Sequence, residues 1–120
     1  MHYTRGVVER GGAMVLKWSP QARKRRKEIY DFYQAVNPQA AKSILEDINS
    51  EALRLTRFPE MAAREPALEG LSRIYRSLVV RHFLKIVYFF EKEKDEVVVV
   101  TIWDCRRNPD KLTNEIEIIQ

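Results

Sequence analysis

The sequence predicts an α+β domain in which a helical hairpin packs on one face of an antiparallel sheet, in the order β-α-α-β-β-β. Apolar residues recur at helical spacing in the first half of the chain. The second half holds three runs rich in valine, isoleucine and aromatic residues, as strands are. Because each apolar stripe must be buried against another element, one sheet backed by two helices is the simplest arrangement. The length of 120 residues, 45% of them hydrophobic, allows a single modest core.

Two helix start signals follow a short predicted strand at residues 15–18. Ser19 precedes Pro20, and Asn37 precedes Pro38. A serine or asparagine side chain accepts an unpaired backbone N–H at the start of a helix, and proline is tolerated at the first helical position. The sequence therefore predicts one helix from Pro20 and a second from Pro38.

Apolar stripes support both helices. The second should end near Phe58, because Pro59 disfavours helical geometry in the residue before it. The short link between the helices predicts an antiparallel hairpin. The stripe residues are Ala22, Ile29, Tyr33 and Val36 in the first helix, and Ala41, Ile44, Ile48, Ala52 and Leu55 in the second.

Extended patterns dominate the rest of the chain. Residues 73–81, 83–91 and 97–104 have strand composition, and the polar residues 92–95 form a turn between the last two. All four residues of the run 97–100 are apolar, so both faces of this strand should be buried and the strand should be central in the sheet.

The domain boundaries are expected near the ends of the chain. Residues 1–13 hold three of the four glycines and show no helical or strand period, which predicts a flexible leader. The folded domain is expected over residues 14–112, followed by a tail at 113–120.

Composition excludes several classes of protein. Cys105 is the only cysteine, and with His2 and His82 it offers too few ligands for a structural zinc site, so no metal or cofactor is expected. No stretch approaches the ~20 apolar residues of a membrane-spanning helix, and the first residues lack a signal-peptide pattern, which predicts a cytoplasmic protein. The oligomeric state is left open.

The charge balance favours an anionic partner. The net charge is +4 and the isoelectric point is about 9.3. Nucleic acid, a ribosome or an acidic protein segment would each satisfy it. The basic run at residues 23–27 goes around its predicted helix, so it is either solvated surface or a steering patch.

Three phrases carry a family resemblance: YRSL at 75–78, FLKIVY at 83–88 and WDCRRNP at 103–109. Together with the order of elements, they resemble the RelE/ParE superfamily of toxins from bacterial type II toxin–antitoxin systems, over roughly residues 14 to 112. The resemblance implies that the members share one fold but act on different targets. RelE-like members cut messenger RNA in the ribosome, and ParE-like members poison DNA gyrase. Both are neutralised by an antitoxin from the same operon, and such systems stabilise plasmids.

The resemblance places RelE-type basic residues at Arg76, Lys85 and Arg106, which would be catalytic if the protein cleaves RNA. Two further RelE positions depart from the pattern, because Leu78 replaces a lysine and Leu112 replaces a tyrosine. The glutamate-and-histidine site of the YoeB branch is also incomplete, since no histidine follows the second arginine of WDCRRNP. A ParE-like gyrase inhibitor without hydrolytic activity is therefore the leading hypothesis, and an mRNA endoribonuclease is the alternative. A third possibility is a basic domain that has lost its activity.

The acid–base candidates that remain are Lys85, His82 and Tyr88. A lysine acts as a base only if its pKa falls several units below about 10.4. Each candidate also has a structural alternative: an ammonium on the open face of the sheet, an exposed turn histidine and a core aromatic, respectively.

We expect cations from separate strands to gather on one anion-binding face of the sheet. The structural alternative for Arg106 and Arg107 is pairing with Asp104 or Asp110 at the end of the sheet. Contacts with the target are expected from Arg73, Arg76, Arg81, Lys85, Tyr88, Arg106 and Arg107, and contacts with the antitoxin from Ile116, Ile118 and Ile119.

Overall fold

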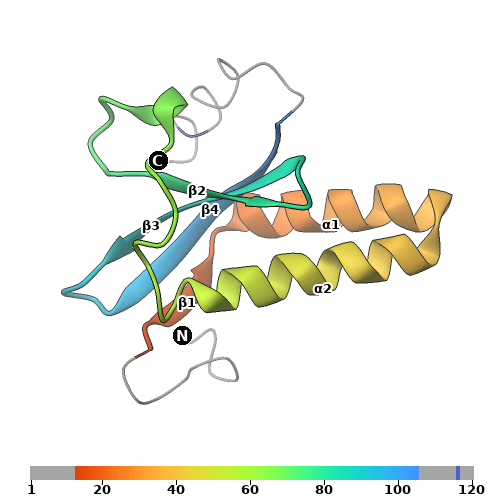
Figure 1. Ribbon diagram of the computed structural model, residues 1–120, viewed down its shortest axis with the longest axis horizontal. Helices are drawn as coiled ribbons and strands as arrows, with labels where there is room; N and C mark the ends of the chain where they lie inside the picture. The colour runs from red at the N-terminus through yellow and green to blue at the C-terminus, as the bar shows by residue number, and fades with distance from the viewer. Residues whose placement is uncertain (1–12, 106–115, 117–120) are drawn as a thin grey trace.

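The computed structural model describes residues 13–105 and residue 116. Within that part of the chain the elements follow the predicted order β-α-α-β-β-β (Figure 1). A short 3-10 helix, η2, lies between the second helix and the second strand. The bounds are β1 Val15–Trp18, α1 Pro20–Val36, α2 Pro38–Arg54, η2 Pro66–Leu68, β2 Arg76–Val80, β3 Leu84–Glu91 and β4 Glu96–Asp104.

Both helices begin where the sequence predicts. The Ser19 hydroxyl oxygen accepts the backbone N–H of Ala22 at 3.0 Å at the start of α1. At the start of α2, the Asn37 side-chain oxygen accepts the backbone N–H groups of Gln39 at 3.1 Å and Ala40 at 3.2 Å. The two N-terminal signals therefore set where each helix begins and where the two helices are linked.

The second helix ends at Arg54, one turn before the predicted Phe58. Leu55 and Thr56 are 0% and 2% exposed, and the carbonyl oxygen of Thr56 accepts the backbone N–H of Met14 at 2.9 Å. Burial of these two residues turns the chain into the core before the proline restriction takes effect. This tertiary contact was not visible in the sequence pattern.

The four strands form one sheet in the order β1-β4-β3-β2. The pairs β2–β3 and β3–β4 are antiparallel, as predicted, but β1 pairs with β4 in parallel, so the sheet is mixed. The hydrophobic pattern of a strand sets its faces and not its direction, which explains the difference. The prediction that residues 97–100 lie in a central strand is confirmed.

Each face of the sheet has its own apolar cluster. The helical hairpin covers one face, as Figure 1 shows, and the cluster there includes Ile48, Ile86 and Val99. We call this the helix face and the other the open face. On the open face, the loop between α2 and β2 supplies Leu68 and Tyr75, and Ile116 completes the cluster.

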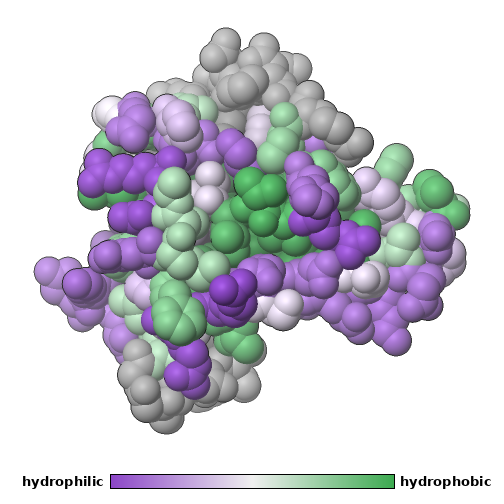
Figure 2. Space-filling model, in the orientation of Figure 1, coloured by the Kyte–Doolittle hydropathy of each residue, from purple (hydrophilic) through white to green (hydrophobic). Residues whose placement is uncertain are grey.

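The far end of the hairpin extends beyond the strands (Figure 1). Of the predicted α1 stripe, Ala22 is fully buried, but Val36 is 71% exposed and Phe32 beside it is 63% exposed. Figure 2 shows hydrophobic side chains at this end of the hairpin and at its junction with the sheet. The expectation that the whole stripe is buried is therefore wrong for its last turn, because this end of α1 extends past the strands that would cover it.

Candidate functional site

Glu65 and Lys85 form an ion pair on the open face of the sheet. Lys85 Nζ lies 2.7 Å from Glu65 Oε1, and the Glu65 side chain is 3% exposed. The Ser77 hydroxyl donates to the same oxygen at 2.8 Å, and the backbone N–H of Ala67 donates to Glu65 Oε2 at 2.9 Å. The carboxylate is thus held by three donors from β2, β3 and η2.

Local structure explains why Glu65 lies there. Glu65 is the N-terminal cap of η2, and its own backbone N–H donates to the Tyr75 carbonyl oxygen at 2.9 Å. Ser77 N–H donates to the carbonyl oxygen of Ala63 at 3.1 Å, so residues 63–65 run antiparallel beside the start of β2. This short pairing fixes the loop against the sheet edge.

The ion pair sets the protonation of the carboxyl. Burial raises the pKa of Glu65, but the hydrogen bonds from Lys85, Ala67 and Ser77 lower it by more, and the net shift is downward. The carboxylate is therefore ionised at neutral pH, and its negative charge balances the positive charge of Lys85. A lysine held in this way is a structural cation and lacks the unpaired environment of a general base.

Arg76 lies on the opposite face of the sheet from Lys85. The β2–β3 register pairs Arg76 with Tyr88, and it pairs Val79 with Lys85. Side chains directly opposite each other share a face, and successive residues alternate. Tyr88 belongs to the cluster under the helices, so Arg76 lies on the helix face and Lys85 on the open face.

Arg76 and Tyr88 are both tied to the loop that follows α2. Arg76 Nη1 donates to the carbonyl oxygen of Ala62 at 2.7 Å, while Arg76 Nε is buried and has no hydrogen-bond partner. Tyr88 is fully buried, and its hydroxyl donates to the Pro59 carbonyl oxygen at 2.7 Å. Burial raises the pKa of Tyr88 above its ordinary value. Tyr88 is thus a core aromatic and does not reach the surface.

Arg73 and Arg76 line a groove of about 600 Å³ beside the end of β3. The Arg73 guanidinium lies 4.1 Å from the centroid of the Phe89 ring and 3.2 Å from Glu91 Oε2. The Arg76 guanidinium lies 5.9 Å from the Phe90 ring. The structure therefore brings these two predicted target-binding arginines to one groove, without Lys85.

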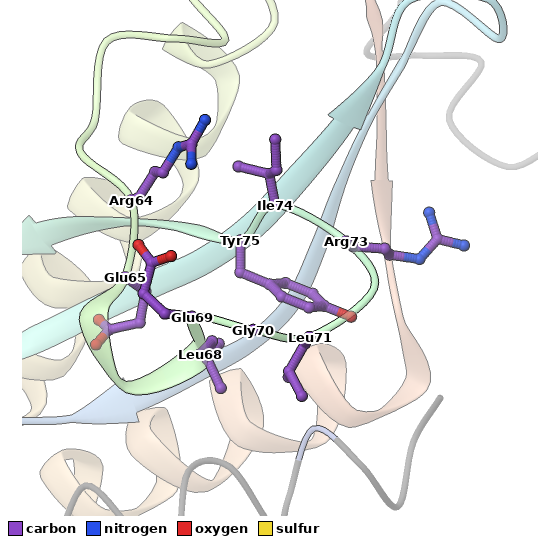
Figure 3. Close-up of a pocket in the computed structure, with 9 residues that line it drawn as sticks. All are labelled: Arg64, Glu65, Leu68, Glu69, Gly70, Leu71, Arg73, Ile74 and Tyr75. Atoms are coloured by element: carbon purple, nitrogen blue, oxygen red, sulfur yellow. The ribbon is translucent and has the colours of Figure 1, made fainter.

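The loop before β2 encloses a smaller cavity of about 200 Å³. Figure 3 shows the Tyr75 ring lying across the inside of this loop, with Arg64 and Arg73 pointing away from it in different directions. Burial raises the pKa of Tyr75. The inward side chains Leu68 and Tyr75 belong to the apolar cluster of the open face, which makes this cavity part of the packing beneath the loop.

Arg81 and His82 occupy the turn between β2 and β3. Both have positive φ values, 54° and 68°, and both are exposed. Arg81 Nη1 lies 2.7 Å from Asp47 Oδ2 and 3.3 Å from Ser43 Oγ on α2. The structure thus places Arg81 on the hairpin and away from the Arg73–Arg76 groove.

Ile116 is the one described residue of the predicted C-terminal segment, and it is 0% exposed. It packs in the open-face cluster with Val87, Val100 and Trp103. Arg106, Arg107 and Leu112 of the predicted domain, and Ile118 and Ile119 of the predicted tail, lie outside the described residues.

A second groove, of about 250 Å³, lies between α1 and the ends of β3 and β4. Its lining includes an aromatic cluster in which the Phe32 and Tyr33 rings are 5.0 Å apart and the Tyr33 and Phe83 rings are 6.2 Å apart. Glu28 and Asp104 add two carboxylates to the lining. Sequence reasoning missed this groove and also Glu65, although an acid directly before Pro66 was a visible capping signal.

The sequence profile of one protein family, described as "ParE toxin of type II toxin-antitoxin system, parDE", matches residues 16–109. The chain belongs to this family. It is therefore the toxin component of a type II toxin–antitoxin system.

Solved structures show that this toxin has the RelE/ParE fold. The chromosomal ParDE system of P. aeruginosa gives a TM-score of 0.63 at 21% identity, covering 78% of this chain and 98% of that one. A mutant of the E. coli toxin RelE in the free state gives 0.63 at 16% identity, covering 90% and 99%. The RelBE2 complex of Mycobacterium tuberculosis gives 0.52 at 14% identity, covering 81% and 97%. No curated protein sequence matches this toxin.

The expectation that cations of the toxin gather on one face of the sheet is wrong for Arg76 and Lys85. The sequence phrases identify the strands correctly, but the register places the two cations on opposite faces. Among residues 13–105 and 116, no group of histidine, cysteine and acidic side chains is placed to hold a metal ion. None of the described helices is long and apolar enough to cross a membrane.

Proposed function

We propose that this toxin inhibits DNA gyrase by binding to it, without hydrolytic chemistry of its own. The observation that carries the proposal is the match to the ParE family profile over residues 16–109. The separation of Arg76 from Lys85 supports it, because RNA cleavage requires several cations and a proton acceptor around one phosphate. Lys85, the lysine expected to act in cleavage, is neutralised by Glu65.

The proposed contact with gyrase is the groove that contains Arg73 and Arg76. Its guanidinium groups lie against the Phe89 and Phe90 rings, and arginine and aromatic side chains are enriched among residues that dominate binding energy at interfaces. Arg81 and Lys85 are assigned to flanking contacts at most, because neither lines this groove: Arg81 lies against α2 and Lys85 on the open face of the sheet. Arg106 and Arg107 remain proposed contacts.

The test is a supercoiling assay with purified gyrase, relaxed plasmid and purified toxin. We expect inhibition by the unmodified toxin, and inhibition about tenfold weaker for Arg73→Ala, which corresponds to about 1.4 kcal/mol of binding free energy. Arg54→Ala is the matched control, because Arg54 is also exposed and ion-paired but lies on α2. Normal supercoiling at saturating toxin would reject gyrase as the target.

The alternative is a RelE-like ribosome-dependent endoribonuclease. The equal TM-scores with the ParDE and RelE structures leave the fold neutral between the two activities. A cell-free translation reaction with the same toxin preparation separates them. Messenger RNA cut between codon positions, together with unaffected gyrase, would favour the alternative.

We also propose that a cognate antitoxin neutralises the toxin and that part of it occupies the groove beside α1. The exposed aromatic cluster there suits the apolar face of an antitoxin segment. Ile116, Ile118 and Ile119 remain proposed antitoxin contacts. Ile116 would have to leave the open-face cluster to make that contact.

A further inference from the structure

The basic run on α1 divides into two groups with different partners. Two of its members are paired with acids of the same helix. Arg25 Nη1 lies 3.1 Å from Glu28 Oε1, and Lys27 Nζ lies 2.7 Å from Asp31 Oδ2. The charges of these two cations are compensated by acids of α1 itself.

Arg23 and Arg26, one turn apart, are held instead by neutral acceptors. Arg23 Nη1 donates to the carbonyl oxygen of Trp18 at 2.9 Å, and Arg26 Nη1 donates to Asn49 Oδ1 at 3.0 Å. The Arg26 guanidinium also lies over the Trp18 ring, 4.2 Å from its centroid. Contacts from β1 and α2 thus fix both guanidinium groups without neutralising them.

Within residues 13–105 and 116, neither Arg23 nor Arg26 has a carboxylate partner, and the same holds for the exposed Lys24 between them. By contrast, Arg54 and Arg81 each form an ion pair with an acid of the toxin. The positive charge of the first turns of α1 is therefore uncompensated at a fixed position.

Two fixed positive charges so close together disfavour each other. Burial lowers the pKa of Arg26, and the charge of Arg23 lowers it further. An anion bound between the two groups would relieve this repulsion. Each guanidinium has five N–H donors in a planar fork, so donors remain after the bonds to Trp18 and Asn49 are made.

We propose that Arg23 and Arg26, with Lys24 beside them, bind the phosphodiester backbone of a nucleic acid. Guanidinium groups match the oxygen geometry of phosphate. Three uncompensated cations within one helical turn suit a chain of closely spaced phosphates better than a single carboxylate. The net charge of +4 adds long-range attraction of the same sign. This activity goes beyond gyrase inhibition and does not depend on it.

The experiment measures fluorescence anisotropy of labelled duplex DNA, and of single-stranded RNA of the same length, with the purified full chain over a range of KCl concentrations. We expect the logarithm of the binding constant to fall linearly with the logarithm of salt concentration. The variant R23Q/R26Q should bind at least about tenfold more weakly at low salt, and its slope on duplex DNA should be smaller by about two. Comparison of the two probes identifies which nucleic acid supplies the phosphates.

The matched control is R54Q/K94Q, which removes the same charge from exposed positions that have acidic partners. Its slope should stay near that of the unmodified toxin. Equal losses in both double variants would overturn the proposal, as would the absence of binding to either nucleic acid. The single variant Arg23→Gln removes an exposed side chain whose bond is to one carbonyl oxygen, so it tests the site without threatening the fold and should reduce the slope by about one.

Discussion

Lys85 on β3 donates to Glu65 across the open face of the sheet at 2.7 Å, and the carboxylate that it meets is almost fully buried. The pair joins the loop before β2 to the centre of the sheet. A buried charge that loses its partner is costly, whereas removal of both charges leaves no uncompensated group. The pair should therefore behave as a unit in mutational tests.

Lys85→Ala should lower the free energy of unfolding by about 1–3 kcal/mol, because it leaves the Glu65 carboxylate buried with two donors in place of three. The double variant Glu65→Gln/Lys85→Ala should lose less than the sum of the two single variants. Urea unfolding of the four proteins measures this coupling. Additive losses would mean that the two side chains act independently.

The same carboxylate predicts how stability depends on pH. The pKa of Glu65 in the folded state lies below its ordinary value, so the unfolded state takes up the proton at higher pH than the folded state does. Its contribution is fully present above the unfolded pKa of about 4.3 and is lost as pH falls through the lower folded value. The free energy of unfolding should therefore fall on acidification below about pH 5.

Glu65→Gln should reduce this loss of unfolding free energy below about pH 5, because the amide does not titrate. The exposed Glu46 on α2 provides the control, and the pH dependence of stability in Glu46→Gln should stay close to that of the unmodified protein. Thermal unfolding followed by circular dichroism over a pH series would show the difference. Superimposable pH profiles for the unmodified and Glu65→Gln proteins would contradict the assignment.

The sequence predicted the elements of this fold because the signals involved are local. Ser19 with Pro20 and Asn37 with Pro38 set the helix starts, and the unbroken apolar run at 97–100 identified the central strand. The direction of β1 and the exposure of the α1 tip depend on how elements meet in space. No periodicity within an element contains that information.

The candidate site was harder to predict because it depends on the register between two strands. Val80 pairs with Leu84 across the turn, so even-numbered residues of β2 lie opposite even-numbered residues of β3. Arg76 therefore lies on the face of the sheet opposite to that of Lys85. A turn one residue shorter would place Arg76 opposite Val87 and on the same face as Lys85. The family phrases identify the strands but do not give the length of the turn between them. The sequence alone therefore could not show that the two cations lie on opposite faces.

Tyr88→Phe tests whether the tyrosine that faces Arg76 is structural. The change removes the hydroxyl that donates to the Pro59 carbonyl oxygen at 2.7 Å in a fully buried position. Loss of that bond should cost about 1 kcal/mol and lower the melting temperature by about 3–6 °C. Gyrase inhibition per folded molecule should be unchanged. A large loss of inhibition in a variant of normal stability would instead give the hydroxyl a direct role.

Phe32→Gln tests the proposed antitoxin groove without disturbing the core. Phe32 is 63% exposed on α1, and glutamine is a good helix former, so stability should change by no more than about 0.5 kcal/mol. Co-expression with the protein encoded beside the toxin gene, followed by affinity purification, should recover less antitoxin with Phe32→Gln than with the unmodified toxin. Leu53→Gln on α2 is the matched control, because it removes another exposed apolar side chain away from the groove lining. Equal recovery with both variants would place the antitoxin elsewhere on the toxin, away from the groove beside α1.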